Sequence, residues 1–329
     1  MTLAAVPNSH VRPASLVLTV LNEGHSLPTF LRSLSAQRHL PSEVVIVDGG
    51  SADDTVEILT AWSPPAGTAV RIVERPGANI SQGRNTAISL AESPWILVTD
   101  GGTVLDPGWI ESLLDSFDGQ PTPTVVSGFF RPTGESLVER AIAFTATPRL
   151  TEIDSATFLP SSRSIAFTRD AWSQAGGYPE WLDYCEDLVF DLRLKELGHR
   201  FAFAPLATVT WSARHSVREF MVQYYRYARG DGKAGLWAKR HSVRYLAYSG
   251  GIALVVVAFW QPIVLIPLVA AGSLYLSKYV RRVWRAREEF GTGLTRGLAL
   301  VPVIVVAGDL AKMAGYPVGL RWKRQNRPS

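Results

Sequence analysis

Three acidic residues follow short apolar stretches in the first third of the chain: Glu23, Asp48 and Asp100. Each stretch has the length and apolar content of a buried strand. Ligands of an open α/β sheet bind beyond the carboxyl ends of its strands, so we expect these acids to gather at one edge. The carboxylate of Asp100, beside Gly101 and Gly102, suits a hard cation that holds a phosphate. The alternative is a solvated acid at a glycine turn.

A second acidic feature is the pair Glu186-Asp187, which opens a helix predicted for residues 184–197. Adjacent helical side chains diverge by about 100°. One acid can therefore take a proton from an attacking hydroxyl while the other orients that group or caps the helix. Like charges this close also raise a pKa. The alternative is an acidic pair that complements the positive end of the helix dipole.

Residues 217–229 have the pattern of an amphipathic helix with a basic face. Gln223, Arg226 and Arg229 recur at intervals of three and lie near one side of this helix, next to the aromatic Tyr227. Such a face can bind an anionic or sugar ligand. It can also lie on a bilayer surface with its arginines in the headgroups, and the two interpretations are compatible.

The elements that position these residues alternate between strand and helix. Early strands are predicted at 15–21, 43–47, 70–73 and 95–98, and helices are predicted to begin near residues 27, 53 and 81. This order is typical of βαβ units with right-handed crossovers, and it predicts an α/β fold with a mostly parallel central sheet and flanking helices. Later strands are predicted at 125–129, 164–168, 201–204 and 207–211. The glycines of 230–232 are expected to end the helix 217–229.

Composition excludes several classes of protein. The 329 residues carry a net charge of +4, which is too small and too dispersed to indicate nucleic-acid binding. The single cysteine, Cys185, excludes an internal disulfide and favours a reducing compartment. Residues 1–14 lack the apolar core of a signal peptide and are predicted to form a flexible tail.

Two long apolar segments follow the predicted α/β domain. Residues 246–277 contain no charged residue, and a transmembrane helix needs only about 20 apolar residues. Because Gln261-Pro262 lies at its centre, this segment is either one kinked span or a hairpin of two short arms. Basic flanks favour the hairpin, with both ends in the cytoplasm. The second segment, 298–320, contains Asp309 and Lys312, which are expected to pair or to face a protein interior.

Six short motifs follow one another along residues 15–232. They are Thr19-Val-Leu-Asn22-Glu23, Val47-Asp48-Gly49-Gly-Ser51-Ala-Asp53-Asp54-Thr55, Gly83-Arg84-Asn85, Asp100-Gly-Gly102, Tyr184-Cys-Glu186-Asp187 and Gln223-Tyr-Tyr-Arg226-Tyr227. In this order they resemble the motifs of inverting family-2 glycosyltransferases with the GT-A fold. Two positions depart from the family pattern: Gly102 replaces the second acid of D-x-D, and Tyr227 replaces the tryptophan of Q-x-x-R-W.

The resemblance implies a role for each matched residue. The residues implied in nucleotide-sugar binding are Thr19, Asn22, Glu23, Asp48, Gly49, Arg84, Asn85 and Asp100. Those implied at the diphosphate or the acceptor are Gln223, Arg226, Tyr227 and Arg229. Asp187 is implied as the catalytic general base, assisted by Glu186. Asp100 is implied to bind Mg²⁺ or Mn²⁺, with His215 as a further candidate ligand, and Gly102 leaves this metal site one acid short.

These expectations describe a membrane-anchored enzyme that moves a sugar from a UDP- or GDP-linked donor to a hydroxyl of a lipid-linked or polysaccharide acceptor. The predicted domains are the tail 1–14, a GT-A domain 15–232 on the cytoplasmic side of the cell membrane, and a membrane-associated region 233–329. The alternatives are a polyprenyl-phosphate sugar synthase, a catalytically silent nucleotide-sugar-binding membrane protein, and a soluble enzyme. The sequence does not indicate the donor sugar, the acceptor or the oligomeric state.

Overall fold

The computed structural model describes residues 12–326, so most of the predicted tail 1–14 lies outside the described residues. The chain forms two compact units. Unit 1 comprises the chain up to Phe130 together with Asp154–Trp211. Unit 2 comprises Arg131–Ile153 and the chain from Ser212 onward.

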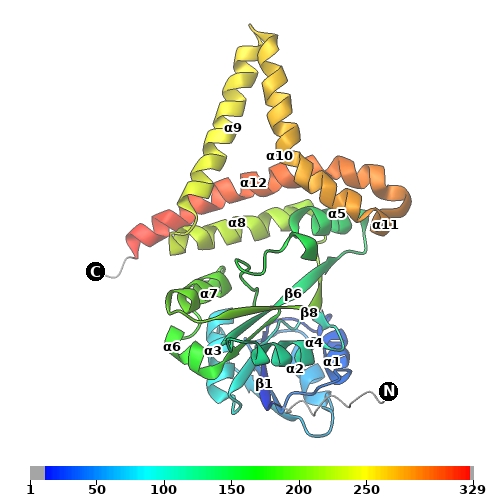
Figure 1. The fold of residues 1–329 in the computed structure, drawn as a ribbon, viewed down its shortest axis with the longest axis vertical. Helices are drawn as coiled ribbons and strands as arrows, with labels where there is room; N and C mark the ends of the chain where they lie inside the picture. The colour runs from blue at the N-terminus through cyan, green and yellow to red at the C-terminus, as the bar shows by residue number, and fades with distance from the viewer. Residues whose placement is uncertain (1–11, 327–329) are drawn as a thin grey trace. The chain divides into compact units, whose positions relative to one another are not determined.

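Unit 1 is organised around a sheet (Figure 1). Eight strands of this sheet are described, in the order β3-β2-β1-β4-β7-β6-β8-β5. The strands are β1 (Ala14–Val20), β2 (Glu43–Asp48), β3 (Ala69–Glu74), β4 (Trp95–Val98), β5 (Thr103–Leu105), β6 (Val125–Thr133), β7 (Ile165–Thr168) and β8 (Phe201–Ser212). The first four pair in parallel. β7 pairs antiparallel with β4 and β6, and β5 with β8. The predicted α/β class is confirmed, and the sheet is mixed.

Helices cover both faces of this sheet. They are α1 (Leu27–Ser35), α2 (Thr55–Ala61), α3 (Ile80–Leu90), α4 (Trp109–Asp115), α6 (Arg169–Ala175) and α7 (Glu186–Glu196). α1, α2 and α4 share one apolar core with Leu16 and Leu18 of β1. α3, α6 and α7 share the other core with Val17. Successive strand residues point to opposite faces, which explains why β1 is apolar throughout rather than alternating.

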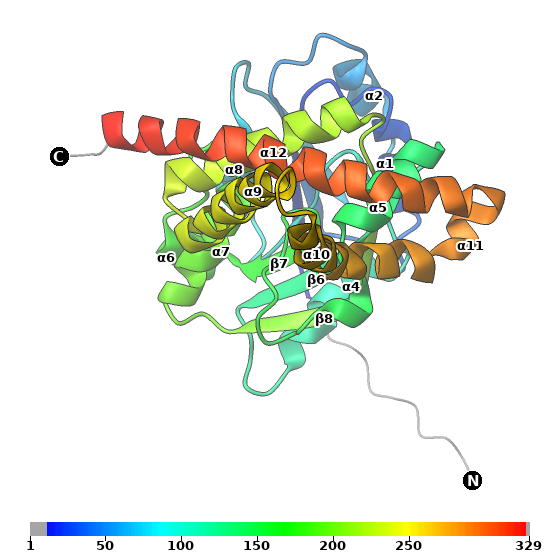
Figure 2. The ribbon, with the colours of Figure 1, turned by 90° about the horizontal axis from the view of Figure 1, so that it is seen from above.

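Unit 2 is helical. Its helices are α5 (Leu137–Ala146), α8 (Val217–Ala234), α9 (Ala238–Ala258), α10 (Leu265–Arg285), α11 (Arg287–Phe290) and α12 (Leu294–Gln325). Figures 1 and 2 show α8 beside α12, and α9 and α10 as the two arms of a hairpin. A core of Ile142, Val283 and Ile304, among others, joins α5, α10 and α12.

The prediction that residues 230–232 end a helix is wrong, because α8 continues to Ala234. Gly232 instead allows α8 to pack closely against α12. A Cβ on Gly232 would lie 2.3 Å from the carbonyl oxygen of Tyr316 in α12, and a Cβ on Gly319 would lie 2.1 Å from that of Arg229 in α8. Small residues let two helix backbones approach each other closely, so these glycines define the α8–α12 interface.

The uncharged segment 246–277 forms the α9–α10 hairpin, which is one of its two predicted arrangements. Each arm has 21 residues and is longer than predicted, because both helices continue into the basic flanks. α12 contains the second apolar segment. By length and composition, Ala238–Ala258, Pro262–Arg285 and Arg287–Gln325 are candidate membrane spans.

Candidate active site

Arg84 is the centre of a buried ion cluster in unit 1. Its side chain is 2% exposed. Nη2 donates a hydrogen bond to Oδ1 of Asp100 at 2.8 Å, and Nη1 donates to Oε1 of Glu186 at 2.8 Å. Burial alone would lower the pKa of Arg84, but the two carboxylates raise it above its ordinary value. One permanent cation therefore joins the end of β4, the helix α3 and the start of α7.

The helix α3 reaches β1 closely enough to place Arg84 because residue 83 is a glycine. A Cβ on Gly83 would lie 2.3 Å from Cγ2 of Thr19. A capping box fixes the start of α3, since the side chains of Asn79 and Gln82 each accept a hydrogen bond from the backbone of the other. Thr19 thus contacts the helix that carries Arg84, and its contact with a nucleotide sugar stays a prediction.

Asp100 follows β4, and its side chain is 29% exposed. Its Oδ2 lies 3.7 Å from Nε of Arg163, whose guanidinium lies over the ring of Trp211 at 4.7 Å. Arg163 is not among the residues predicted from the sequence. It reaches Asp100 because β7 runs antiparallel to β4, so that the start of β7 meets the end of β4. Local sequence pattern carries no signal for that pairing.

Glu186 and Asp187 occupy different environments. Glu186 is buried, and this burial together with the charge of Asp187 raises its pKa to about 7, against the opposing effect of Arg84. Asp187 is half-buried, and its Oδ1 accepts a hydrogen bond from the backbone N–H of Leu188. Cys185, just before the pair, has a φ of 66°, a left-handed conformation that costs a residue with a side chain about 1 kcal/mol. Because Glu186 is buried and Asp187 is only half-buried, Asp187 is the acid of the pair that solvent reaches.

The loop after β1 is tied to the loop after β2, at the edge predicted for both. Asn22, with a φ of 55°, donates its backbone N–H to the hydroxyl of Ser51 at 2.8 Å. Glu23 donates its backbone N–H to the hydroxyl of Thr55 at 2.9 Å, and the hydroxyl of Ser26 donates to its carboxylate. The parallel pairing of β1 with β2 brings the two loops together.

Asp48 shapes the loop that follows it. The side chain is 1% exposed and accepts hydrogen bonds from the backbone N–H groups of Gly50 at 2.8 Å and Ser51 at 2.9 Å. Gly49 donates its own N–H to the carbonyl of Val20 at 2.9 Å, which joins the ends of β2 and β1. The nucleotide contacts of Asp48 and Gly49 stay predictions.

Asn85 holds the chain segment that leads to α7. Its Oδ1 accepts hydrogen bonds from the backbone N–H of Tyr178 at 2.8 Å and from the indole of Trp172 at 3.2 Å. The ring of Tyr178 stacks on Phe190 at 4.3 Å and lies 5.3 Å from the guanidinium of Arg84. Asn85 therefore positions the aromatic wall beside Arg84, and a direct nucleotide contact stays a prediction.

Asp191 is a further acid that the sequence analysis did not single out. It is 1% exposed, and within the described residues neither carboxylate oxygen has a hydrogen-bond partner. Burial, and then the charge of Asp187, raises the pKa of Asp191 well above its usual range. Its position one helical turn after Asp187 was the available sequence signal.

Unit 2 carries the predicted residues of α8. Nε2 of Gln223 donates to the hydroxyl of Tyr227 at 2.8 Å, and Gln223 is buried. Arg226 is exposed and Arg229 is half-buried. The i, i+4 bond orders the glutamine and the aromatic ring on one face of the helix. Contacts of these four residues with a diphosphate or an acceptor stay predictions.

His215, also in unit 2, pairs with Glu139. Nδ1 of His215 lies 3.0 Å from Oε1 of Glu139. This hydrogen bond lowers the pKa of Glu139 to about 2 and raises the pKa of His215. A histidine that binds a metal through one ring nitrogen commonly has a carboxylate bonded to the other ring nitrogen. The bond to Glu139 is therefore compatible with metal binding by His215, which stays a prediction.

Within residues 12–326, no three His, Cys, Asp or Glu side chains gather closely enough to hold a metal ion. A cation that also binds phosphate oxygens needs only one or two protein carboxylates. Asp100 offers one beside the side-chain-free turn Gly101-Gly102, where a Cβ on residue 101 would lie 3.0 Å from Cγ1 of Val20. This arrangement fits a cation that takes most of its ligands from phosphate oxygens and water.

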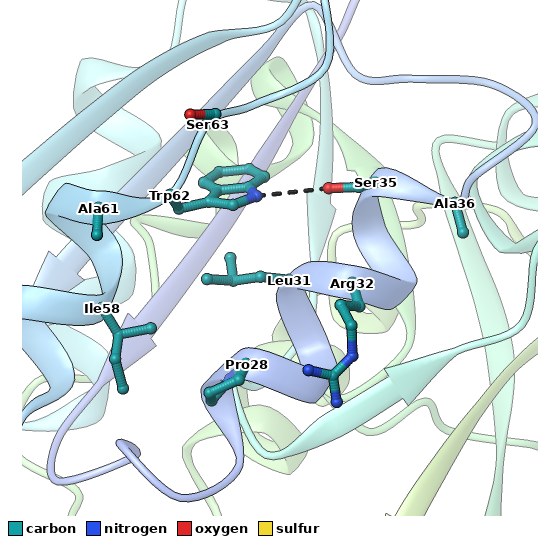
Figure 3. Close-up of a pocket in the computed structure, with 9 residues that line it drawn as sticks. All are labelled: Pro28, Leu31, Arg32, Ser35, Ala36, Ile58, Ala61, Trp62 and Ser63. Carbon is teal, nitrogen blue, oxygen red and sulfur yellow. Dashed lines mark hydrogen bonds between the residues drawn. The ribbon is translucent and has the colours of Figure 1, made fainter.

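A depression of about 570 Å³ lies apart from these residues, on the α1–α2 layer of unit 1 (Figure 3). Leu31, Ile58 and Trp62 contribute to its lining, and Nε1 of Trp62 donates to the hydroxyl of Ser35 at 3.4 Å. None of the nine residues that line it belongs to the ion cluster. The candidate active site is therefore the strand edge around Arg84.

Comparisons with known proteins identify the family that the first half of the chain resembles. Residues 15–165 match the family model "Glycosyl transferase family 2". The chain is 24% identical to the glycosyltransferase AglE of Haloferax volcanii, covering 92% of this chain and 94% of the relative. It is 25% identical to the succinoglycan biosynthesis protein ExoA of Rhizobium meliloti, covering 92% and 93%.

A solved structure gives the same result for the fold. The mannosyltransferase PcManGT from Pyrobaculum calidifontis, solved in complex with GDP-Man and Mn²⁺, aligns with a TM-score of 0.54 at 15% identity. The alignment covers 100% of this chain and 92% of that structure. Residues 15–165 therefore carry a glycosyl transferase family 2 domain, and the protein is a glycosyltransferase.

Proposed function

We propose that this glycosyltransferase moves a sugar from a UDP- or GDP-linked donor to a hydroxyl of a lipid-linked or polysaccharide acceptor, with inversion at the anomeric carbon. Inversion by direct displacement needs one carboxylate that faces the acceptor and a cationic environment for the leaving diphosphate. The chain offers both within unit 1. Asp187 is the half-buried acid, and Arg84 is the buried cation.

The observation that supports this proposal most is that two adjacent acids have different environments. Glu186 turns inward and pairs with Arg84 at 2.8 Å, while Asp187 is reached by solvent. A general base must lie within hydrogen-bond distance of the hydroxyl that it deprotonates. An acceptor that enters from solvent can reach only a solvent-accessible carboxylate. Asp187 would take the acceptor proton, and Glu186 would hold Arg84 in place.

Asp100 would hold Mg²⁺ or Mn²⁺ when the donor binds. Such a cation, when bound, neutralises charge that develops on the departing diphosphate. Arg84 would act on the same group, because it is already bonded to Asp100 at 2.8 Å. Asp48, Asn22 and Glu23 belong to the loops at the same strand edge and would contact the nucleoside or the sugar.

The membrane is the proposed environment of the α9–α10 hairpin. Between Arg244 and Lys278 this segment carries no charge, and large apolar side chains such as Phe259 and Trp260 at its tip are 82% and 74% exposed. Basic residues at both hairpin ends favour a cytoplasmic location for those ends. We place the catalytic unit on the cytoplasmic side for this reason. Extraction of membranes tests the anchor: carbonate should leave the chain in the pellet, and release by salt alone would contradict insertion.

A transfer assay tests the catalytic assignment. Membranes containing the full chain are incubated with a panel of labelled UDP- and GDP-sugars, and wild type is compared with Asp187→Asn and Asp170→Asn. Asp170 is a matched control, since it is an exposed acid in the first turn of α6 as Asp187 is in that of α7. Loss of a general base typically costs about 10²–10⁴-fold in turnover.

We expect Asp187→Asn to lose transfer by that factor while binding of the nucleotide persists, and Asp170→Asn to behave as wild type. Full activity of Asp187→Asn would contradict its role as the base and favour a phosphate acceptor, which needs no strong base. Binding without turnover or hydrolysis in the wild type would contradict the enzyme proposal and favour a silent nucleotide-sugar-binding protein.

A further inference from the structure

The turn after β4 contains one acid where a cation site would use two. Asp100 is followed by Gly101 and Gly102, and its carboxylate is already surrounded by cations. Oδ1 accepts from Arg84 at 2.8 Å, and Oδ2 lies 3.7 Å from Nε of Arg163. A carboxylate whose charge is offset by two guanidinium groups attracts a divalent cation weakly. A second carboxylate at this turn would restore the attraction.

Glu23 has its carboxylate at that turn. A Cβ on residue 102 would lie 3.3 Å from Oε2 and 3.7 Å from Oε1 of Glu23. A Cβ on residue 101 would lie 3.8 Å from Cγ of the same side chain. The carboxylate of Glu23 is therefore close to where the side chain of an aspartate at position 102 would begin. β1 and β4 are neighbours in the sheet, which is why the loop after β1 reaches the turn after β4.

The backbone at Glu23 is fixed on both sides. Its N–H donates to the hydroxyl of Thr55 at 2.9 Å, and its carbonyl accepts from the N–H groups of Ser26 at 3.0 Å and Leu27 at 2.8 Å. The hydroxyl of Ser26 also donates a hydrogen bond to the carboxylate itself, so the side chain is held at this turn. Glu23 thus meets the requirement for a ligand that must be in place before the cation arrives.

We propose that Glu23 supplies the second carboxylate of a divalent-cation site whose first carboxylate is Asp100. The two acids come from neighbouring strand ends instead of from one D-x-D turn. This inference rests on the proposed use of a nucleoside-diphosphate donor, whose phosphate oxygens and bound water would complete the coordination, as they commonly do for Mg²⁺. It assigns to Glu23 a role different from contact with the nucleoside.

The test measures Mn²⁺ binding directly. Loss of the free Mn²⁺ signal in electron paramagnetic resonance is recorded for the full chain in detergent, with and without UDP or GDP. The variants are Glu23→Gln, the exchange Glu23→Ala with Gly102→Asp, and the control Glu92→Gln. Glu92 is an exposed acid just before β4, at the opposite end of that strand from Asp100. Gly102 has no left-handed φ, so an aspartate is sterically allowed there.

We expect Glu23→Gln to weaken Mn²⁺ binding in the presence of nucleotide by about tenfold or more, because even an outer-shell partner of a metal costs 10–100-fold when removed. Glu92→Gln should bind as wild type. The exchange variant should regain the affinity, which would also show that the loss in Glu23→Gln does not arise from misfolding.

Unchanged Mn²⁺ binding in Glu23→Gln would overturn the inference, and so would failure of the exchange variant to bind Mn²⁺ better than Glu23→Gln. Absence of nucleotide-dependent Mn²⁺ binding in the wild type would also overturn it. Binding of UDP and GDP is measured in parallel by calorimetry in the presence of EDTA. If the wild type binds neither nucleotide under any condition, the proposed function itself fails, and the two failures are thereby distinguished.

Discussion

Each unit buries a group of charged side chains, and the two groups are built in opposite ways. In unit 1 a cation, Arg84, lies between the carboxylates of Asp100 and Glu186. In unit 2 an anion, Asp309, lies among donors from two other helices. Both central groups are almost fully buried, at 2% and 3% exposure. They differ in how much of their hydrogen-bonding capacity is used.

The cluster around Asp309 is saturated at its carboxylate. Oδ1 accepts from Nε of Arg244 at 2.9 Å, and Oδ2 accepts from the hydroxyls of Tyr248 at 3.2 Å and Tyr275 at 2.5 Å. Nζ of Lys312 lies 3.9 Å from Oδ1 of Asp309, so the predicted pairing of this lysine with Asp309 is also present. Since Arg244 and Tyr248 belong to α9 and Tyr275 to α10, one carboxylate fastens both arms of the hairpin to α12.

The cluster around Arg84 keeps unused capacity. Nε of Arg84 and both oxygens of Asp191 lack a hydrogen-bond partner in the part of the chain that the structure describes. Buried polar groups are nearly always paired, so unpaired ones on α3 and α7, the helices that carry Arg84 and Glu186, indicate where a ligand is expected. Replacement of a whole charge pair by apolar residues should therefore be tolerated in the Asp309 cluster, whose bonds fasten α9 and α10 to α12. It should abolish function in the Arg84 cluster.

The largest effect is expected from Arg84→Met. This change leaves Asp100 and Glu186 without their shared cation, and an uncompensated buried charge costs about 3–5 kcal/mol of stability. The melting temperature of the full chain in detergent and the rate of sugar transfer are the two measurements. We expect a large fall in the first and complete loss of the second.

Arg71→Met is the matched control for that change. Arg71 is half-exposed and pairs with Glu92 at 3.3 Å on the surface, where such a pair contributes at most about 1 kcal/mol. If Arg84→Met melts within the range of this control and still transfers sugar, Arg84 is not the centre of the site.

A smaller effect is expected from Asp309→Leu. It leaves the guanidinium of Arg244 buried without its carboxylate, which should cost about 3 kcal/mol. The double variant Asp309→Leu with Arg244→Leu removes both charges and should recover most of the melting temperature, because a buried pair is often replaceable by apolar residues. Transfer activity should persist in the double variant.

The double variant is the direct test of the contrast between the two clusters. A well-folded double variant without transfer activity would mean that Asp309 and Arg244 take part in function. The Asp309 cluster would then be more than a structural fastening of the hairpin to α12.

Sequence alone predicted the strand-end acids but not what they contact. The apolar runs of β1, β2 and β4 located Glu23, Asp48 and Asp100 at one edge, because parallel strands end together. The bond from Arg84 to Glu186 joins residues 102 positions apart and depends on how α7 packs, which local pattern does not contain.

The sequence also misled where one residue type has two uses. Glycine ends helices, but it also lets helices touch, and at Gly232 the second use applies because α12 passes within contact of α8. At Asp309 the prediction from sequence was correct. Its position in an apolar segment correctly predicted a partner, since an unpaired charge there is too costly.

A moderate effect is expected from Gly319→Ala. The new Cβ would lie 2.1 Å from the carbonyl oxygen of Arg229, so α8 and α12 must separate, at a cost of about 2 kcal/mol. Gly272→Ala in α10 is the control, since nothing lies within 4 Å of its added Cβ and alanine favours a helix by up to about 1 kcal/mol. Melting temperatures should move in opposite directions. Equal shifts would mean that α8 and α12 do not pack through these glycines.

The most gradual effect is a dependence of stability on pH in the Arg84 cluster. Burial and the charge of Asp187 raise the pKa of Glu186 from 4.5 to about 7 in the folded protein, with Arg84 opposing the shift. Between these two values the folded state holds a proton that the unfolded state has lost. This contribution to stability is therefore fully present below pH 4.5 and is lost as the pH rises to about 7, with a slope of at most about 1.4 kcal/mol per pH unit for one proton.

Glu186→Gln should flatten this slope, because glutamine does not titrate. The melting temperature of both proteins is measured from pH 5 to pH 8 in steps, at constant ionic strength. Asp191 has a raised pKa for the same physical reason and contributes a slope of the same sign, so Glu186→Gln should reduce the slope and the double variant with Asp191→Asn should reduce it further. Identical slopes in wild type and Glu186→Gln would mean that Glu186 is fully ionised beside Arg84. The unit 1 cluster would then resemble the saturated Asp309 cluster rather than contrast with it.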